Sequence, residues 1–364
     1  MKIKEITHFL ENRFPLGSQA SFDNCGLLVG DPEQECSSAL ISLDCTEEVV
    51  DEAITQGHQM IISHHPILFK GLKKLNGSNY VERVIIKAIQ HGIALYAIHT
   101  NLDHSIQGVN LEIARRLGVQ NPAILSPQAE TLHKLVVFVP KTHLKEVEQA
   151  LFQAGAGRIG NYAECSFYSE GTGNFKPTGA ASPFEGQLNE RSSVEELRLE
   201  VLVDKYRIGA VLKALNNTHP YEEVAHEIYP IQNLNQEEGS GMIGELAEEM
   251  DALEFLKRIK QDFHCGVIRH TELVKKNVKK IAFCGGSGSF LLGQAKARGA
   301  DIYITGDFKY HEFFDAEKDL IIADIGHYES EQFTSDLIKH ILSEKFTNFA
   351  LHLSRINTNP IKYL

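Results

Sequence analysis

The chain lacks the sequence features that mark several large classes of protein. Its 364 residues contain no apolar run near the roughly 20 residues needed to cross a bilayer. Lys and Arg form no block, and the formal net charge is −12, which argues against a protein held on nucleic acid by phosphate neutralisation. Residues 1–14 mix charged side chains with apolar ones at helical spacing, so we expect no signal peptide.

The cysteines lack the paired spacing of a metal-binding or redox motif. The chain has six, far apart in the sequence and without a C-x-x-C pair, so a cysteine-based zinc finger is not expected. We expect reduced, mostly buried thiols in a cytoplasmic protein. The cysteines are Cys25, Cys36, Cys45, Cys165, Cys265 and Cys284.

The composition and length are those of an ordinary globular protein of about two domains, with 43% hydrophobic and 23% charged residues. Residues 38–118, and the chain again after about residue 240, alternate short β-branched runs with helical stretches. This alternation predicts βαβ units and an α/β domain with a largely parallel sheet covered by helices on both faces. The expected strands are 39–43, 60–62, 93–98, 280–284, 302–305 and 320–323, and a long helix is expected at 328–345.

The middle of the chain follows a different pattern. A strand at 134–140 and a helix at 144–151 are repeated as a strand at 199–203 and a helix at 208–215, and a further strand follows each pair. Two βαβ halves in tandem predict a ferredoxin-like α+β unit. Residues 170–191 are expected to form a loop, and 233–240 a polar exit linker. We therefore expect residues 1–130 and 236–364 to form one α/β metal-binding domain, interrupted by an insert at 131–235.

Polar residues of the kinds that bind metals follow four apolar runs. In an α/β protein, ligands collect at the carboxyl ends of the strands, so the repeated pattern predicts one shared metal site. The four stretches are 60–66 with His64 and His65, 95–104 with His99, Asp103 and His104, 302–307 with Asp307, and 321–331 with His327 and Glu331.

Each of these residues also has an ordinary structural interpretation. His64 and His65 are adjacent and would point to opposite faces of a regular strand, as one core and one surface histidine. An isolated Asp103 would be a turn or cap residue. His327 and Glu331 share one helix face, which is also the spacing of a surface i,i+4 pair. All five residues together indicate a metal site far more specifically than any one of them does alone.

Together the candidates supply three histidines and two carboxylates and no sulfur. Such ligands suit zinc, iron, manganese, nickel or cobalt. Five ligands exceed the needs of one open catalytic zinc site. With Glu331 bridging, they suit two divalent ions ~3.5–4 Å apart that hold a water of lowered pKa.

Three further segments are candidates for supporting roles. Asp307 and His311 are the best candidates for ligand support or general acid–base catalysis, with a helix N-cap Asp and an exposed helical His as the alternative. The glycine-rich segment 285–289 could hold a phosphate but matches no phosphate-binding motif, so a tight turn is favoured. Residues 23–26 are expected to form a turn, and the alternative is that they line the pocket.

Over nearly its whole length the chain resembles the GTP cyclohydrolase 1 type 2 homologues, the Nif-three-like family. The motifs that carry this resemblance are 23–27 (DNCGL), 63–66 (SHHP), 99–103 (HTNLD), Gly306-Asp307 with His311, and 326–331 (GHYESE). The segment at 131–235, with 219–223 (HPYEE), is similar to the PII/CutA-like domain of the longer bacterial members. The resemblance implies two metal ions held by His64, His65, Asp103, His327 and Glu331, with Glu331 contacting both.

The resemblance also implies a ring-shaped homohexamer with its sites facing an internal cavity and its inserts packed as trimers. The family name implies hydrolytic opening of the guanine imidazole ring of GTP with release of formate. A metal-dependent hydrolase acting on a nucleotide or related small molecule is therefore the leading hypothesis. The alternative is a non-enzymatic binding or regulatory hexamer whose insert binds an effector or partner. A DNA-encircling ring is disfavoured by the acidic charge.

Overall fold

The computed structural model describes all residues, 1–364, and they form two compact units. The first unit is discontinuous and comprises Met1–Ser126 and Glu238–Leu364. The second unit, Pro127–Glu237, is the insert. The predicted α/β class with a ferredoxin-like insert is confirmed.

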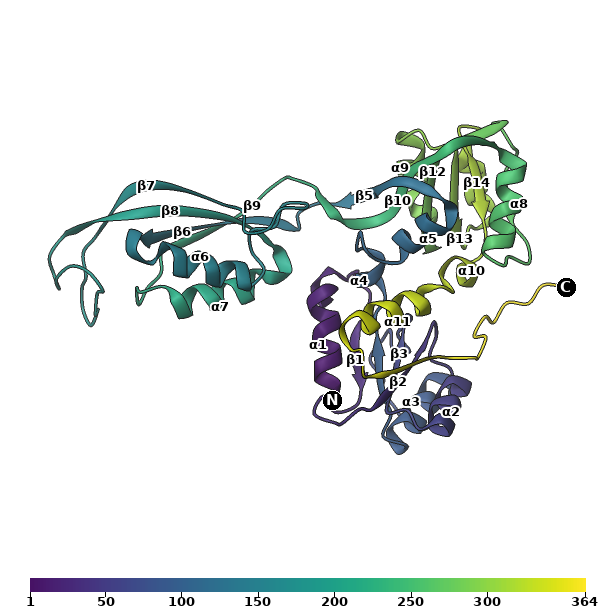
Figure 1. Ribbon diagram of the computed structural model, residues 1–364, viewed down its shortest axis with the longest axis horizontal. Helices are drawn as coiled ribbons and strands as arrows, with labels where there is room; N and C mark the ends of the chain where they lie inside the picture. Colours follow the sequence, from purple (N-terminus) through teal and green to yellow (C-terminus); the bar gives the residue numbers. More distant parts are fainter. The chain divides into compact units, whose positions relative to one another are not determined.

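The discontinuous unit contains two sheets, each with parallel strands at its centre (Figure 1). The five-stranded sheet has the order β1-β4-β3-β2-β15, in which only the β1–β4 pair is antiparallel. In the six-stranded sheet, β11-β14-β13-β12-β10-β5, the β12–β13 and β13–β14 pairs are parallel. The strands are β1 (Gly26–Val29), β2 (Ser38–Ser42), β3 (Met60–Ser63), β4 (Ala94–Ala97), β5 (Val119–Gln128), β10 (Asn235–Asp251), β11 (Arg269–His270), β12 (Asn277–Ser287), β13 (Ile302–Gly306), β14 (Ile321–Asp324) and β15 (Ala350–Leu353).

Local capping residues set the ends of several helices in this unit. Thr46 accepts a hydrogen bond from the Val49 N–H at 3.4 Å, and Asp251 accepts from the N–H groups of the first turn of α8. Gly118 ends α5 in the left-handed conformation, at φ 69°. The helices are α1 (Ile3–Arg13), α2 (Glu47–Gln56), α3 (Tyr80–Gln90), α4 (Thr100–Asp103), α5 (Val109–Leu117), α8 (Ala252–Asp262), α9 (Leu292–Ala297), α10 (His327–Glu331) and α11 (Thr334–Lys345).

The largest core lies between the two sheets. It joins the inner faces of both sheets to apolar residues of α1, α5, α8 and α11, such as Leu10, Ile113, Phe255 and Ile338. The other face of the five-stranded sheet is covered by α2 and α3. The other face of the six-stranded sheet packs against α9. Helices thus cover the outer faces of both sheets, and the shared core holds the strand ends of the two sheets in fixed positions relative to one another.

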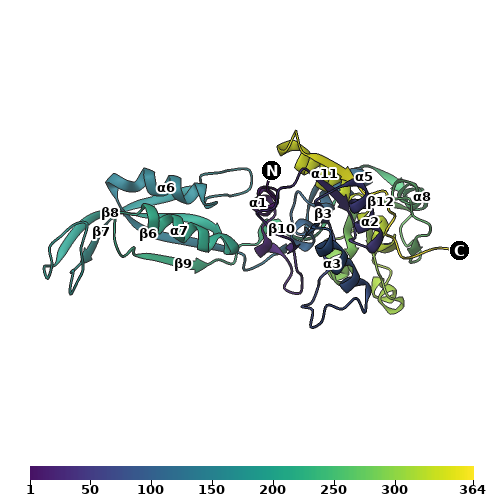
Figure 2. The same ribbon diagram turned by 90° about the horizontal axis from the view of Figure 1, so that it is seen from below.

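The insert has the strand order β7-β8-β6-β9, with every neighbouring pair antiparallel. This order and the sequence β-α-β-β-α-β are those of a ferredoxin-like unit. Both helices pack through one apolar cluster on one face of the sheet (Figures 1 and 2). Its elements are β6 (Leu132–Pro140), α6 (Leu144–Gln153), β7 (Ser166–Phe175), β8 (Ser192–Asp204), α7 (Ile208–Thr218) and β9 (His226–Pro230).

Some local expectations differ from the structure. The expected helix 328–345 is two helices, α10 and α11, and at the break the Gln332 side chain donates to the carbonyl oxygens of Phe263 and Glu329. The expected loop 170–191 is strand as far as Phe175, because β8 supplies a hydrogen-bonded partner along its length. Residues 235–240 of the expected linker already belong to β10. Distant strand partners override weak local propensity in both cases.

The structure also divides the expected parallel strands between two sheets. Periodicity identifies a buried strand but not its neighbours, so the sequence pattern gave no sign of this division. None of the helices combines the length and apolar composition needed to cross a membrane.

Candidate metal centre

The candidate ligands converge where parallel strands of both sheets end. His64 and His65 directly follow β3, and Asp103 ends the short helix α4 just beyond β4. From the other sheet, α10 begins at His327 just after β14 and ends at Glu331. All five predicted ligand residues therefore meet in one place, as expected for the carboxyl ends of parallel strands.

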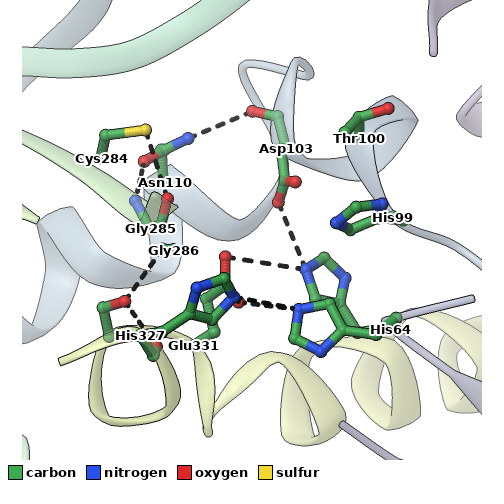
Figure 3. Close-up of polar contacts among 12 residues, drawn as sticks. His64, His99, Thr100, Asp103, Asn110, Cys284, Gly285, Gly286, His327 and Glu331 are labelled. Carbon is green, nitrogen blue, oxygen red and sulfur yellow. Dashed lines mark hydrogen bonds and ion pairs between the residues drawn. The ribbon is translucent and has the colours of Figure 1, made fainter. Parts of the chain in front are cut away.

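The ligand atoms form two groups of three that share Glu331. In the first group, His64 Nε2 lies 3.5 Å from Asp103 Oδ1 and 3.9 Å from Glu331 Oε1. In the second, His65 Nε2 and His327 Nε2 each lie 3.1 Å from Glu331 Oε2, and 3.3 Å from one another. Figure 3 shows the Glu331 carboxylate between the His64 and His327 rings. Each carboxylate oxygen thus faces a different group.

The second nitrogen of each of the three histidines is occupied. Nδ1 of His64 lies 2.8 Å from the carbonyl oxygen of Ile98, which can only accept a hydrogen bond. Nδ1 of His65 lies 2.8 Å from Asp44 Oδ1, and Nδ1 of His327 lies 2.7 Å from Asp307 Oδ2. In the neutral rings these acceptors place the proton on Nδ1 and leave each Nε2 lone pair directed into the centre, the arrangement of metal-binding histidines.

The first group contains buried polar atoms without partners. His64 Nε2 and Asp103 Oδ1 are buried and make no hydrogen bond. Such atoms carry a desolvation penalty unless something pairs with them. A divalent cation between His64, Asp103 and Glu331 would satisfy both atoms, so these residues fit a metal ion.

The second group requires a cation for a related reason. Burial would lower the pKa of His65 and His327, but hydrogen bonds and charges from Glu331, Asp44 and Asp307 raise the pKa to about 9 for His65 and about 11 for His327. Burial likewise opposes ionisation of Glu331, yet His327 and the other two histidines hold the pKa of Glu331 well below its usual range. Without metal, protons at Nε2 supply the positive charge that a metal ion would otherwise bring.

The centre opens into a cleft of about 860 Å³. The exposed aromatic rings of Phe22, Phe69, Tyr80 and Phe290 line it, and the Phe69 ring packs edge-on against His99 with centroids 5.8 Å apart. No Lys or Arg lines this cleft. The surroundings therefore favour a planar apolar ring over a highly charged phosphate chain.

Of the two residues expected to move protons, only Asp307 contacts the metal centre. Asp307 contacts the centre through its hydrogen bond to His327, which lowers the pKa of the Asp307 carboxyl. The backbone of Asp307 is left-handed, at φ 60°. His311 is exposed, packs against Tyr310 and Phe314, and does not line the cleft. Nothing in this chain connects His311 to the metal centre.

The glycine-rich segment packs against the centre as the irregular end of strand β12, rather than as the expected tight turn. The Gly285 N–H donates to Asn110 Oδ1 at 3.1 Å, and the Gly286 N–H donates to Ser330 Oγ at 2.9 Å (Figure 3). These N–H groups are therefore occupied rather than free to hold a phosphate. A Cβ on Gly286 would lie 2.4 Å from Glu331 Oε1, so a side chain there would collide with the shared carboxylate.

Two residues at the centre were missed or left unassigned by sequence reasoning. Asp44 follows the buried run 40–43, so the pattern of an apolar strand followed by a polar residue could have identified it. His99 was noted only as a neighbour of Asp103. Its ring forms a third group with His64 and His65, their nitrogens within 4.8 Å of one another. Asp23 accepts from His99 Nδ1 at 2.9 Å, which gives the expected turn at 23–26 a place beside the centre.

The fold and this geometry together define an α/β protein with a candidate two-metal centre at the ends of its strands. The chain belongs to the Duf34/NIF3 (NGG1p interacting factor 3) family, which matches residues 1–360. The resemblance seen in the sequence motifs is thereby confirmed.

The chain is similar over its whole length to proteins of about the same length. A protein of Halalkalibacterium halodurans named "GTP cyclohydrolase 1 type 2 homolog" is 38% identical over 364 residues, 99% of this chain and 98% of that protein. A Staphylococcus epidermidis protein of the same name is 36% identical over 368 residues and covers all of both chains. A solved Bacillus cereus protein related to NIF3 is 39% identical, with a TM-score of 0.85 over 100% of this chain and 99% of that one. A solved Staphylococcus aureus protein is 32% identical, with the same coverage and a TM-score of 0.78.

Proposed function

We propose that this protein binds two divalent metal ions and uses them to hydrolyse a nucleotide or a related small molecule. The observation that carries the proposal is the pair of ligand groups sharing Glu331: His64 and Asp103 on one side, His65 and His327 on the other. Two ions bridged by one carboxylate at the base of an open cleft are a common arrangement in hydrolases.

Bound ions of this kind act as Lewis acids and lower the pKa of a water molecule. The protein's own residues hold the ligands in place and shape the cleft. Asp44 and Asp307 orient the rings of His65 and His327. Asp307, 46% exposed at its side chain, is also the candidate for proton transfer at the edge of the centre. His311 is exposed and has no contact with the centre within this chain, so Asp307 is the stronger candidate.

The proposed substrate has an aromatic heterocycle. The phenyl rings at the mouth of the cleft can stack on such a ring. The names of the relatives point to GTP, whose base offers this ring. Because this chain places no Lys or Arg in the cleft, recognition of the base is better supported than recognition of the phosphates.

The test is a turnover assay on a panel of purine and pyrimidine nucleotides, nucleosides and bases with metal-replete protein. We expect formate or another hydrolysis product that disappears with chelator, returns with added metal, and is absent in His64→Ala. The matched control is His340→Ala, on the exposed face of α11. A metal-loaded protein that leaves the whole panel unchanged contradicts the hydrolase proposal.

We also propose that the protein is a homohexamer, as the family resemblance implies, and that it is cytoplasmic, as its unpaired cysteines lead us to expect. Light scattering after size exclusion should give six times the chain mass of 40.7 kDa. A monomer or dimer at micromolar concentration would contradict this assembly.

A further inference from the structure

The insert contains a cavity of its own, remote in sequence from the metal ligands. Its volume is about 700 Å³, and it is bounded by β6, β7, β8, the loop that follows β7 and the segment that follows α7. Phe138, Phe175, Phe184 and Tyr221 contribute aromatic walls. The segment after α7 contains the 219–223 motif (HPYEE), which the metal centre does not use.

The cavity lies on the face of the sheet that the helices do not cover. In β8, Leu199 and Val201 belong to the core beneath α6 and α7. Side chains alternate along a strand, so Glu196 and Arg198 project from the opposite face. Both line the cavity.

Glu196 is a buried carboxylate without a counter-charge. The residue is only 7% exposed and takes part in no ion pair. Its neighbour on this face, Arg198, is instead paired with Glu200, and Lys141 is paired with Glu170 and Glu195. Buried carboxylates are rare unless they are paired, because removing the charge from water is unfavourable.

The Tyr221 hydroxyl is the second polar group that faces the cavity. It is buried, and the Glu196 carboxylate is the only side-chain group that interacts with it as a hydrogen-bond acceptor. Burial, the hydrogen bond to Glu196 and the charge of that carboxylate raise the pKa of Tyr221, so the phenol stays neutral and its oxygen can still accept a hydrogen bond. The Tyr221 ring lies beside that of Phe184, with centroids 6.1 Å apart.

The position of Tyr221 is fixed by buried hydrogen bonds. His219 Nε2 donates to the carbonyl oxygen of Phe138 at 2.9 Å, and His219 Nδ1 accepts the Tyr221 N–H at 3.1 Å. His219 is itself buried and packs edge-on against the Tyr221 ring. These contacts tie the 219–223 motif to β6 and hold the hydroxyl in the cavity.

From these observations we infer that the insert binds an organic cation with an apolar body. The ligand's ammonium group would pair with Glu196 and donate to the Tyr221 oxygen, and its apolar part would lie against Phe138 and Phe184. The charge of the cavity lining also favours a cationic ligand, because its acidic residues outnumber its two basic ones, Lys176 and Arg198. The acidic residues are Glu170, Glu185, Glu196, Glu222 and Glu223. This site is independent of the metal centre and of the proposed hydrolysis.

The test uses three probes of similar shape on the full chain: benzylamine as the cation, benzyl alcohol as the neutral form and benzoate as the anion. Binding is measured by titration calorimetry on the wild type and on Glu196→Gln, Tyr221→Phe and Glu195→Gln. Glu195 is the matched control because it is adjacent, 77% exposed at its side chain and paired with Lys141. Circular dichroism and thermal melting verify that each variant is folded.

We expect benzylamine to bind the wild type at least about tenfold more tightly than benzyl alcohol or benzoate. Glu196→Gln should remove that preference, Tyr221→Phe should weaken benzylamine binding by a smaller factor, and Glu195→Gln should leave it unchanged. Equal binding of all three probes, or benzylamine binding that survives in folded Glu196→Gln, overturns the proposal. Saturable binding of Ca²⁺ or Mn²⁺ that is lost only in Glu196→Gln would instead make the cavity a metal site and overturn it as well.

Discussion

At the scale of single residues, the metal centre depends on how each histidine is held. Ile98, Asp44 and Asp307 accept hydrogen bonds from Nδ1 of His64, His65 and His327 and so direct every Nε2 inward. Ordinary imidazoles would share their proton between both nitrogens and rotate. We therefore expect the outer acceptors to contribute to metal affinity beside the ligands themselves.

Asp44→Ala tests this role of the outer acceptors. We expect metal affinity to fall by about 10- to 100-fold, because the His65 ring loses the partner that fixes its tautomer. Competition with a coloured chelator measures the change. The control is Asp51→Ala, on the exposed face of α2. Equal affinity in Asp44→Ala and wild type would show that His65 needs no such support.

The raised pKa values of His65 and His327 predict a pH dependence. In metal-free protein these histidines stabilise the fold below their ordinary pKa of 6.5, and this stabilisation is lost as the pH rises through about 9 for His65 and about 11 for His327. A metal ion must displace the same Nε2 protons, so its binding strengthens over the same window. The increase in melting temperature on adding Mn²⁺ should therefore grow from about pH 6 to about pH 8.5. A constant or shrinking increase would contradict this coupling.

Residues that directly follow a buried strand could be predicted from the sequence. Residues that reach the centre only through a contact with a distant part of the chain could not. His64, His65, Asp103, His327 and Glu331 were each predicted from an apolar run followed by a polar group, and the structure brings them together. Thr358 donates to Asp44 Oδ2 at 2.5 Å across 314 residues of sequence. No periodicity can reveal such a contact. His311 was proposed from its closeness to Asp307 in sequence, but its side chain is exposed and does not line the cleft.

At the scale of elements, glycines allow the strand ends to pack against α10. A Cβ on Gly306 would lie 2.7 Å from the backbone nitrogen of His327, and one on Gly286 would lie 2.4 Å from Glu331 Oε1. These close approaches connect β12 and β13 directly to two ligands. The presence of most helices and strands of this unit could be predicted from sequence. Their exact ends and the division into two sheets could not, because these depend on which strands pair.

Gly286→Ala should disturb the shared carboxylate more than the fold. The added methyl group meets Glu331, and φ at this position is +62°, so we expect loss of at least one metal ion per chain and a lower melting temperature. Gly293→Ala is the control, since nothing lies within 4 Å of its Cβ position in α9. It should keep its metal and gain up to about 1 kcal/mol of stability. If Gly286→Ala binds as much metal as the wild type, the added methyl group does not disturb the Glu331 carboxylate, which would contradict this prediction.

The segment after β15 forms part of the wall of the metal cleft. Thr358 and Asn359 line it, and Thr358 bonds to the carboxylate that orients His65. Thr358→Val should weaken metal binding by about threefold to tenfold, whereas Thr358→Ser should restore it, because serine keeps the hydroxyl. Chelator competition on both variants decides the matter. If valine and serine behave alike, the hydroxyl has no part in holding Asp44.

At the scale of the whole molecule, the chain combines two units with separate chemistry. The discontinuous unit gathers nitrogen and oxygen ligands where the strands of two sheets end. The insert is a ferredoxin-like unit with its own core and its own cavity. The alternation of strands and helices in the sequence indicated both units, because each has a different order of elements. The chemistry of the insert cavity was not visible in the sequence, since Glu196 and Tyr221 meet only through folding.

The most direct test of the account is the number of metal ions per chain, measured by mass spectrometry on protein purified without an affinity tag and equilibrated with Mn²⁺ or Zn²⁺. We expect two ions in the wild type, one in His65→Ala, where only the group of His64, Asp103 and Glu331 is intact, and none firmly bound in Glu331→Ala. A wild type that holds one ion or none after equilibration, or a His65→Ala variant that still holds two, would contradict the two-metal centre.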